Sequence, residues 1–194
     1  GARLRGNTSQ VYPKKPFALK FTEKKSVLGM PKHKRWVLLA NWLDHSMIRN
    51  TVAFDIAQSI EKAWRENGSI EAGVPWNVHG KNVELIVVDK DGDAHHVGNY
   101  LLCEQIKIDE NRLNISKPYE DGGNGYLFEI DTNYDENYKF KTSNGVPFMF
   151  KDDVTDAIVS SVKTKIQGIE TNINNGNFDA AFSDLDINSV IDQM

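Results

Sequence analysis

Residues 3–50 read RLRGNTSQVYPKKPFALKFTEKKSVLGMPKHKRWVLLANWLDHSMIRN, and this stretch sets the pattern for the whole chain. It holds 11 of the 23 Lys and Arg residues and only two acids, Glu23 and Asp44, so its net charge is +9. The complete chain carries −4, which leaves −13 on the remaining residues. This separation of charge indicates that the first quarter meets a polyanion or docks on the chain's own acidic remainder.

The run FALKF at residues 17–21 is typical of a β-strand. Its period of two places Lys20 on the face opposite the three large apolar side chains. The turn RGNTS at residues 5–9 precedes this strand, and a Gly-containing turn followed by a strand with one Lys is a layout that holds phosphate oxygens. The alternative is that Lys20 faces solvent on an edge strand and that Arg5 and Asn7 only stabilise their own turn.

Length and composition fit one globular domain. The 194 residues, 40% of them hydrophobic, are enough for one core and at most a small appendage. Cys103 is the single cysteine, which excludes an intrachain disulfide and indicates a small buried residue. No apolar run approaches the roughly 18 residues that a membrane span needs, so no span is expected.

Helical and strand patterns follow one another along the chain. The run WVLLA at residues 36–40 predicts a short buried strand or helical turn. Asp44 or Ser46 can cap the next helix, which should end near Asn67-Gly68. Its apolar residues recur at every fourth position: Ile48, Val52, Ile56 and Ile60.

The second half of the chain predicts a hairpin, a further strand pair and more helix. Residues 83–88 and 96–102 flank a polar turn and predict a β-hairpin. Residues 126–131 alternate as a strand that residues 148–150 can pair with, and the spacing over 152–175 predicts a second amphipathic helix. Residues from Phe178 onward should open a further helix. This order predicts an α+β fold with a mainly antiparallel sheet and packed helices.

Two clusters of polar residues are not assigned to a metal. Asp89, Asp91 and Asp93 lack the EF-hand spacing because Gly92 comes before the third acid, so we interpret them as a solvated hairpin turn. His95 and His96 are adjacent in a strand and point to opposite faces. Nucleic acid is not an expected partner either, because the pI is about 5.7 and no nucleic-acid-binding pattern is present.

Several blocks, in order, carry a family resemblance that no single motif provides. The sequence resembles the CotH family of bacterial spore-coat and surface proteins. The blocks are RGNTS at 5–9, YPKKPF at 12–17 with LKF at 19–21, LGM at 28–30, WVLLAN at 36–41, Asp44 with IRN at 48–50, GNYLLCEQI at 98–106 and GYLFEID at 125–131.

The resemblance implies a divergent protein-kinase-like fold that uses ATP and Mg²⁺ and transfers the γ-phosphoryl group to Ser or Thr of a partner protein. It implies that residues 5–9, with Arg5, Gly6 and Asn7, take the place of the glycine-rich loop and that Lys20 contacts phosphates. The helix after Ser46 would then be the regulatory helix. Residues 101–106, with Glu104, would form the hinge beside the adenine, unless Glu104 is an ordinary strand-end carboxylate paired with Arg49 or Lys107.

The resemblance also implies how the chain is divided. Residues 1–194 would form a single CotH-like domain, with a small lobe and hinge at 1–106 and the start of a second lobe at 107–194. The family's metal-binding block resembles Trp-Asp-Phe-Asp after an Asn-x-Asp segment and is not found here. We therefore expect a fragment truncated at its C-terminus, inactive as an enzyme, with no catalytic residue or metal ligand of its own.

Two functions from different classes remain open at this point. The first is a secreted or surface-associated kinase of a bacterium that acts on a protein substrate. The second is a non-catalytic binding or structural module with a kinase-like fold and a surface protein as its partner. Both place the protein outside the cell or at the cell surface, by resemblance alone.

Overall fold

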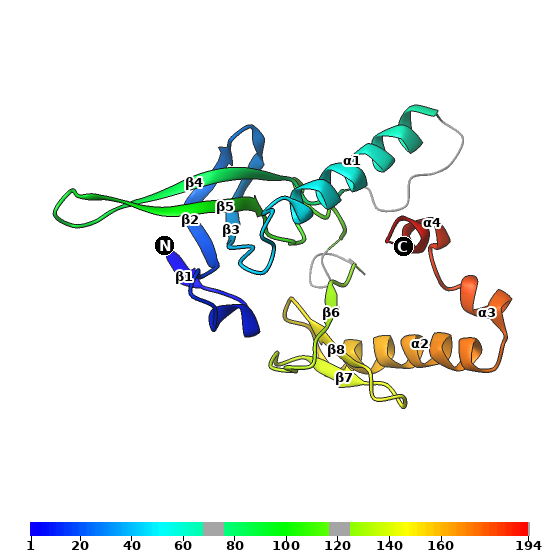
Figure 1. Ribbon diagram of the computed structural model, residues 1–194. Helices are drawn as coiled ribbons and strands as arrows, with labels where there is room; N and C mark the ends of the chain where they lie inside the picture. Colours follow the sequence, from blue (N-terminus) through cyan, green and yellow to red (C-terminus); the bar gives the residue numbers. More distant parts are fainter. Residues whose placement is uncertain (68–75, 117–124, 194) are drawn as a thin grey trace. The chain divides into compact units, whose positions relative to one another are not determined.

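The computed structural model describes residues 1–67, 76–116 and 125–193 (Figure 1). The chain forms two compact units, the first from residues 1–70, 75–106 and 111–113 and the second from residues 71–74, 107–110 and 114–194. The predicted assignment of residues 1–106 and 107–194 to two kinase-like lobes stays a prediction.

The first unit contains a five-stranded antiparallel sheet in the order β1-β2-β3-β5-β4. The α+β class and the antiparallel sheet predicted from the sequence are thus confirmed. The elements are β1 (Ala2–Leu4), the 3₁₀ helix η1 (Thr8–Gln10), β2 (Phe17–Val27), β3 (Met30–Leu39), α1 (Arg49–Asn67), β4 (Gly80–Val88) and β5 (Ala94–Glu104).

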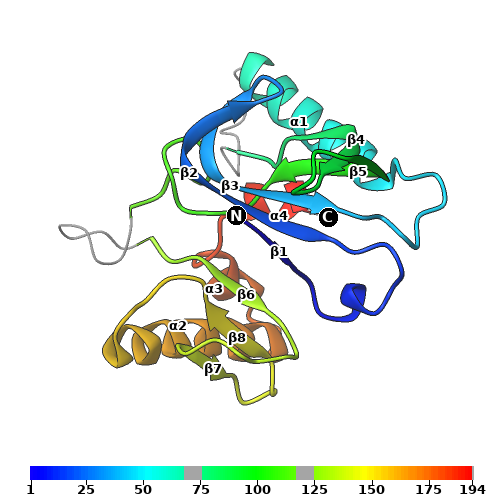
Figure 2. The ribbon, with the colours of Figure 1, turned by 90° about the vertical axis from the view of Figure 1, so that its left-hand side faces the viewer.

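The sheet buries different residues on its two faces because successive side chains alternate. One face packs Met30, Trp36, Leu38, Ala40, Tyr100 and Leu102 into the larger core. The other face packs Val37, Leu101 and Cys103 against Phe54 of α1, which runs beside β4 (Figure 2). Burial raises the pKa of the Cys103 thiol to about 12, as expected for a small residue packed in the core.

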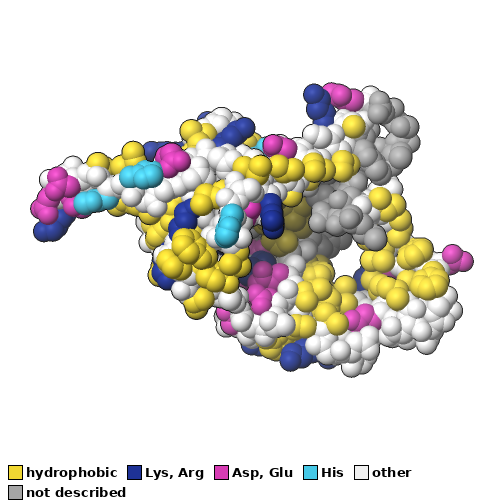
Figure 3. Space-filling model, in the orientation of Figure 1, with side chains coloured by type: hydrophobic (Ala, Val, Ile, Leu, Met, Phe, Trp, Pro, Cys, Tyr) yellow, Lys and Arg dark blue, Asp and Glu magenta, His cyan; other side chains and the backbone are white. Residues whose placement is uncertain are grey.

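The predicted hairpin is confirmed as β4 and β5, which continue as a two-stranded ribbon. Asp89 closes its turn by accepting from the backbone N–H groups of Asp91 (2.9 Å) and Asp93 (3.0 Å). His95 Nε2 lies 2.9 Å from the second carboxylate oxygen of Asp89. Acidic and His side chains gather on this ribbon (Figure 3).

The helix predicted after Asp44 or Ser46 is confirmed as α1, which begins at Arg49, and Asp44 helps to begin it. Asp44 Oδ2 accepts from the N–H of Arg49 at 2.9 Å, and hydrogen bonds, first that of the Ser46 hydroxyl, lower the pKa of this carboxyl. The apolar stripe from Val52 to Ile60 does not face the sheet: its side chains are between 37% and 55% exposed. The predicted cap at Gly68 lies outside the described residues.

The second unit packs a three-stranded sheet, in the order β6-β8-β7, against an amphipathic helix. Its core is aromatic, with Phe140, Phe148 and Phe150 at its centre and Ile158, Val162 and Ile166 of the helix against them. The elements are β6 (Phe128–Ile130), β7 (Lys139–Lys141), β8 (Pro147–Phe150), α2 (Asp156–Asn174), α3 (Phe178–Phe182) and α4 (Ile187–Gln193).

The sequence predicted most of this second unit. β6 pairs with β8, and α2 matches the helix predicted at 152–175, with Thr155 as its N-cap. The single helix predicted after Phe178 is instead two short helices, because Asp186 interrupts it and accepts from the N–H of Ser189 at 3.3 Å. None of the described helices is long and apolar enough to cross a bilayer.

Candidate functional site

A pocket of 330 Å³ lies where β2 begins and β3 ends. The loop between β1 and β2, the residues after β3 and the start of α1 form its walls. Its lining residues are Arg5, Ser9, Tyr12, Lys14, Pro16, Leu39, Ala40, Asn41, Trp42, Leu43, Asp44 and Asn50. The pocket therefore combines two cationic side chains and one carboxylate, Asp44, with an apolar wall.

The predicted turn at residues 5–9 is tightly closed by its own main chain. Gly6 has φ +83°, and its carbonyl accepts from the side-chain amide of Gln10. The Asn7 carbonyl accepts from the N–H of Gln10 at 3.2 Å, and Arg5 N–H donates to the Pro16 carbonyl at 3.2 Å. These bonds fix the place of the Arg5 side chain at the pocket.

Replacing Gly6 with alanine should destabilise this turn by about 1–2 kcal/mol, because an L residue is strained at positive φ. The added Cβ would also lie 2.0 Å from Ser9 Oγ, so the hydroxyl must move. Gly29→Ala is the matched control: Gly29 has φ +81° but open space around a Cβ. Urea denaturation of both variants separates the two effects, and equal losses would show that Ser9 adjusts without cost.

Lys14 crosses from this loop to β5, a role that the sequence analysis did not assign. Its ammonium donates to the Asn99 carbonyl and lies 4.6 Å from the centre of the Tyr100 ring. Burial lowers the pKa of Lys14, and the charge of Glu84 offsets part of this effect. The prolines at 13 and 16 are a signal for this placement, since they hold the loop extended.

Four cationic side chains gather on the α1 side of the sheet, and we call them the cationic face: Arg3, Arg5, Lys20 and Arg35. Arg3 is opposite Ala18 and Lys20 is opposite Arg35, which places them on the same face as Val37 and Cys103. Arg5 comes two residues after Arg3, so alternation places it on this face as well. Its charge lowers the pKa of the Cys103 thiol, against the larger effect of burial. The prediction that Lys20 faces away from Phe17, Leu19 and Phe21 is confirmed.

Among the residues that the structure describes, no carboxylate forms an ion pair with the cationic face, although Asp44 lines the same pocket as Arg5. Lys20 is exposed and Arg35 is half-buried, and none of the four cations forms a salt bridge with another residue that the structure describes. Like charges directly opposite each other in an antiparallel pair are destabilising, so the Lys20–Arg35 pair costs stability in the free protein. An anion between these side chains would remove that cost.

Glu104 lies on the other face of the sheet from Lys20. Glu104 is opposite Trp36 and therefore on the same face as Trp36, while Lys20 is opposite Arg35 and on the same face as Arg35. Arg35 and Trp36 are adjacent in β3, so their side chains point to opposite faces. The structure therefore brings Arg5 and Lys20 to one face and turns the Glu104 side chain away from them. Of the residues assigned by resemblance, Arg5 and Ser9 of the turn at 5–9 line the pocket, and Gly6, Asn7, Lys20 and Glu104 do not.

Glu104 is held in a buried ion pair that the sequence did not predict. Its Oε1 lies 2.6 Å from Arg112 Nη1, and both side chains are fully buried. The Arg112 guanidinium also lies 4.9 Å from the centre of the Trp36 ring. The alternative that Glu104 pairs with Arg49 or Lys107 is wrong, because Arg49 pairs with Asp44 and Glu104 pairs with Arg112.

A family model for the CotH kinase protein matches residues 2–194. The chain belongs to the CotH kinase protein family. A search of curated proteins gives no match. CotH kinase family membership fits a protein that can use ATP.

The CotH assignment raises the question of magnesium ligands. Within residues 1–67, 76–116 and 125–193, no group of three or more His, Cys, Asp or Glu side chains is arranged to hold a metal ion. Asp184 and Asp186, two acids close together in the sequence, lie in the turn between α3 and α4, where Asp184 pairs with Lys165 and Asp186 accepts from the N–H of Ser189.

Proposed function

We propose that the cationic face binds the triphosphate of ATP and that the protein serves the transfer of the γ-phosphoryl group to Ser or Thr of a partner protein. The observation that carries this proposal is the array of four uncompensated cations on one face of β1, β2 and β3. Family membership supports the choice of ATP over other polyanions.

The cations of the array are spaced along the direction of β2. The position of Arg5, beside Pro16, and the position of Lys20 are four residues apart along β2, which corresponds to about 13 Å of strand. Phosphoryl transfer depends mainly on positioning and on cancellation of negative charge, and Arg5, Lys20 and Arg35 supply that charge here. Bound Mg²⁺ would neutralise further charge on the phosphates; the described residues offer it no ligand set, so no step is assigned to it.

The kinase-like arrangement is part of the same proposal. The helix α1 follows β3 and precedes β4 in the chain and packs on the sheet, which supports its role as the regulatory helix. The end of β5 is the segment that we propose as the hinge. Because the Glu104 side chain is tied to Arg112, we propose that the hinge would meet the adenine through main-chain groups near Glu104. The partner in this proposal is a protein at a bacterial surface.

Titration with magnesium–ATP tests the proposal. Lys20→Gln should weaken binding about tenfold and the double variant Lys20→Gln/Arg35→Gln about a hundredfold, since each charge-assisted contact contributes about 1.5–3 kcal/mol. Lys25→Gln is the control: this residue lies further along β2, past a register shift, and is also exposed.

A second measurement gives the proposal its sharpest check. Lys20→Gln removes the repulsion with Arg35, so the free protein should become more stable by about 0.2–1 kcal/mol while its affinity falls. Absent binding by the unchanged protein, or equal affinity in Lys20→Gln and Lys25→Gln, would contradict the assignment of the nucleotide to this face. Binding of ATP without transfer of phosphate to a protein would favour the non-catalytic module.

A further inference from the structure

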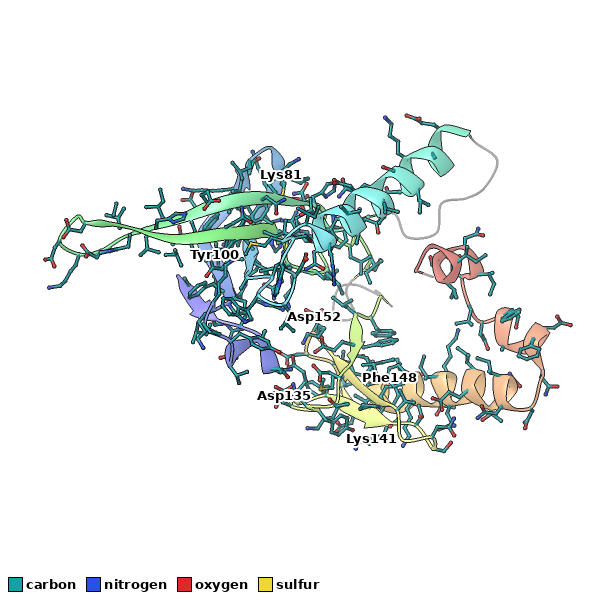
Figure 4. The ribbon with its side chains drawn as sticks, in the orientation of Figure 1. Lys81, Tyr100, Asp135, Lys141, Phe148 and Asp152 are labelled. Carbon is teal, nitrogen blue, oxygen red and sulfur yellow. The ribbon has the colours of Figure 1, made fainter. Side chains whose placement is uncertain are left out.

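A second pocket, of 290 Å³, lies at the opposite end of β3 from the first one. The turn between β2 and β3, the start of β4 and one side of α1 enclose it, and it shares no lining residue with the pocket at Arg5. His79, Gly80 and Lys81 form one wall, and Asp55 and Gln58 of α1 form another. Figure 4 labels Lys81 on β4.

His79 is held in this wall by its main chain and its ring. Its N–H donates to Glu104 Oε2 at 3.0 Å, and its carbonyl accepts from the N–H of Glu104 at 3.0 Å. Its ring atom Nδ1 lies 2.9 Å from the same Oε2, and the His79 side chain is 37% exposed whereas Glu104 is 0% exposed. Gln58 donates to the Val78 carbonyl at 3.0 Å and so fixes α1 beside it.

The ion pair with Arg112 decides which ring nitrogen of His79 titrates. Glu104 Oε1 lies against the Arg112 guanidinium and Oε2 accepts from the His79 N–H, so the carboxylate acts as a hydrogen-bond acceptor. His79 Nδ1 must therefore carry a proton, which leaves Nε2 as the atom that gains or loses one at the pocket. The hydrogen bond to Glu104 raises the pKa of His79, although burial acts against it.

The charges around His79 favour an anion when Nε2 is protonated. Glu104 and Arg112 compensate each other, so the imidazolium and Lys81 leave the pocket wall positive. Asp55 lines the pocket from α1, and the charge of Glu61 on the same helix helps to raise the pKa of His79. These carboxylates limit the site to a ligand with a single anionic group.

We propose that this pocket binds one small oxyanion group, a phosphate or a carboxylate, between His79 Nε2–H and Lys81. The site does not depend on nucleotide binding at the cationic face. Its affinity should fall as the pH rises through the pKa of His79, because the neutral ring no longer donates from Nε2.

Long-range ¹H–¹⁵N spectra of the His rings in the full chain test this proposal. Inorganic phosphate and, in a separate arm, acetate are added at about pH 6 and at about pH 8.5. We expect a saturable shift of His79 Nε2 at the lower pH, with affinity at least about tenfold weaker at the higher pH. Response to phosphate alone would identify a phosphoryl group as the ligand, and response to both would identify a carboxylate as equally acceptable.

His95 is an internal control in the same spectra, because it also pairs with a carboxylate, Asp89, but on the exposed ribbon. Lys81→Met should weaken binding about fivefold without touching the Glu104 contact. His79→Gln should abolish the anion-induced shifts of the Gly80 and Lys81 amides. The proposal is overturned if neither anion gives a saturable shift, if His95 responds as strongly as His79, or if affinity is independent of pH.

Discussion

Arg112→Leu is expected to lower the free energy of unfolding of the first unit by about 3–5 kcal/mol, because it leaves the buried carboxylate of Glu104 without its counter-charge. The Arg112 and Glu104 side chains are both fully buried, and the atoms of the pair lie 2.6 Å apart. The variant also loses the contact between the guanidinium and the Trp36 ring. Urea denaturation followed by Trp fluorescence measures the loss.

A double variant separates the charge from the packing. In Arg112→Leu/Glu104→Gln the buried group is neutral, and its amide oxygen can still accept from the N–H of His79, so a large part of the stability should return. Arg112→Lys keeps the charge but lacks the planar group over Trp36, so its free energy of unfolding should lie between those of the single and the double variant. A loss below about 1 kcal/mol in Arg112→Leu would mean that water reaches Glu104 and that the pair is less buried than described.

Phe148→Ala is expected to destabilise the second unit by about 3–5 kcal/mol, since a buried aromatic is removed from a close-packed core. Phe148 is 8% exposed, stacks on Phe140 with ring centres 5.1 Å apart, and meets the Phe128 ring at 5.6 Å. Hydrogen exchange of the amides in β6, β8 and α2 measures the effect where it arises.

The matched control for Phe148 is another stacked phenylalanine with little burial. Phe182 stacks on Phe178 at 6.1 Å but is 48% exposed. Phe182→Ala should therefore cost well under half as much as Phe148→Ala, because less apolar surface leaves the protein interior. Similar losses in both variants would contradict the assignment of the Phe140–Phe148–Phe150 cluster as the core.

Local patterns predicted the longer helices, the β4–β5 hairpin and the direction of Lys20, but not β1, β7 or the neighbours of Lys20. A regular hairpin continued from the Val27–Met30 pair would place Lys20 opposite Val37. Register shifts between Lys20 and Val27 place it opposite Arg35 instead. No local sequence signal gives the size of these shifts, so the second cation of the pair was missed.

The partners of Glu104 were missed for a related reason. Arg112 lies eight residues after Glu104, in a segment without helical or strand periodicity. His79 lies 25 residues before Glu104. A buried ion pair leaves no periodic signal, since it depends on how a loop returns to the sheet. The apolar stripe of α1 shows a different limit of sequence patterns. Its spacing predicted that the segment is helical, but not that Phe54, which is outside the stripe, would be the residue that packs on the sheet.

The position of Cys103 provides a probe of how the sheet opens. It is the chain's single thiol and lies at the centre of the sheet, opposite Val37 of β3 and Gly80 of β4. An alkylating reagent needs the thiolate, which forms readily only when these strands separate and the sulfur meets water. The rate of alkylation under native conditions therefore reports the opening of the strands that carry both candidate sites, and no additional cysteine has to be introduced.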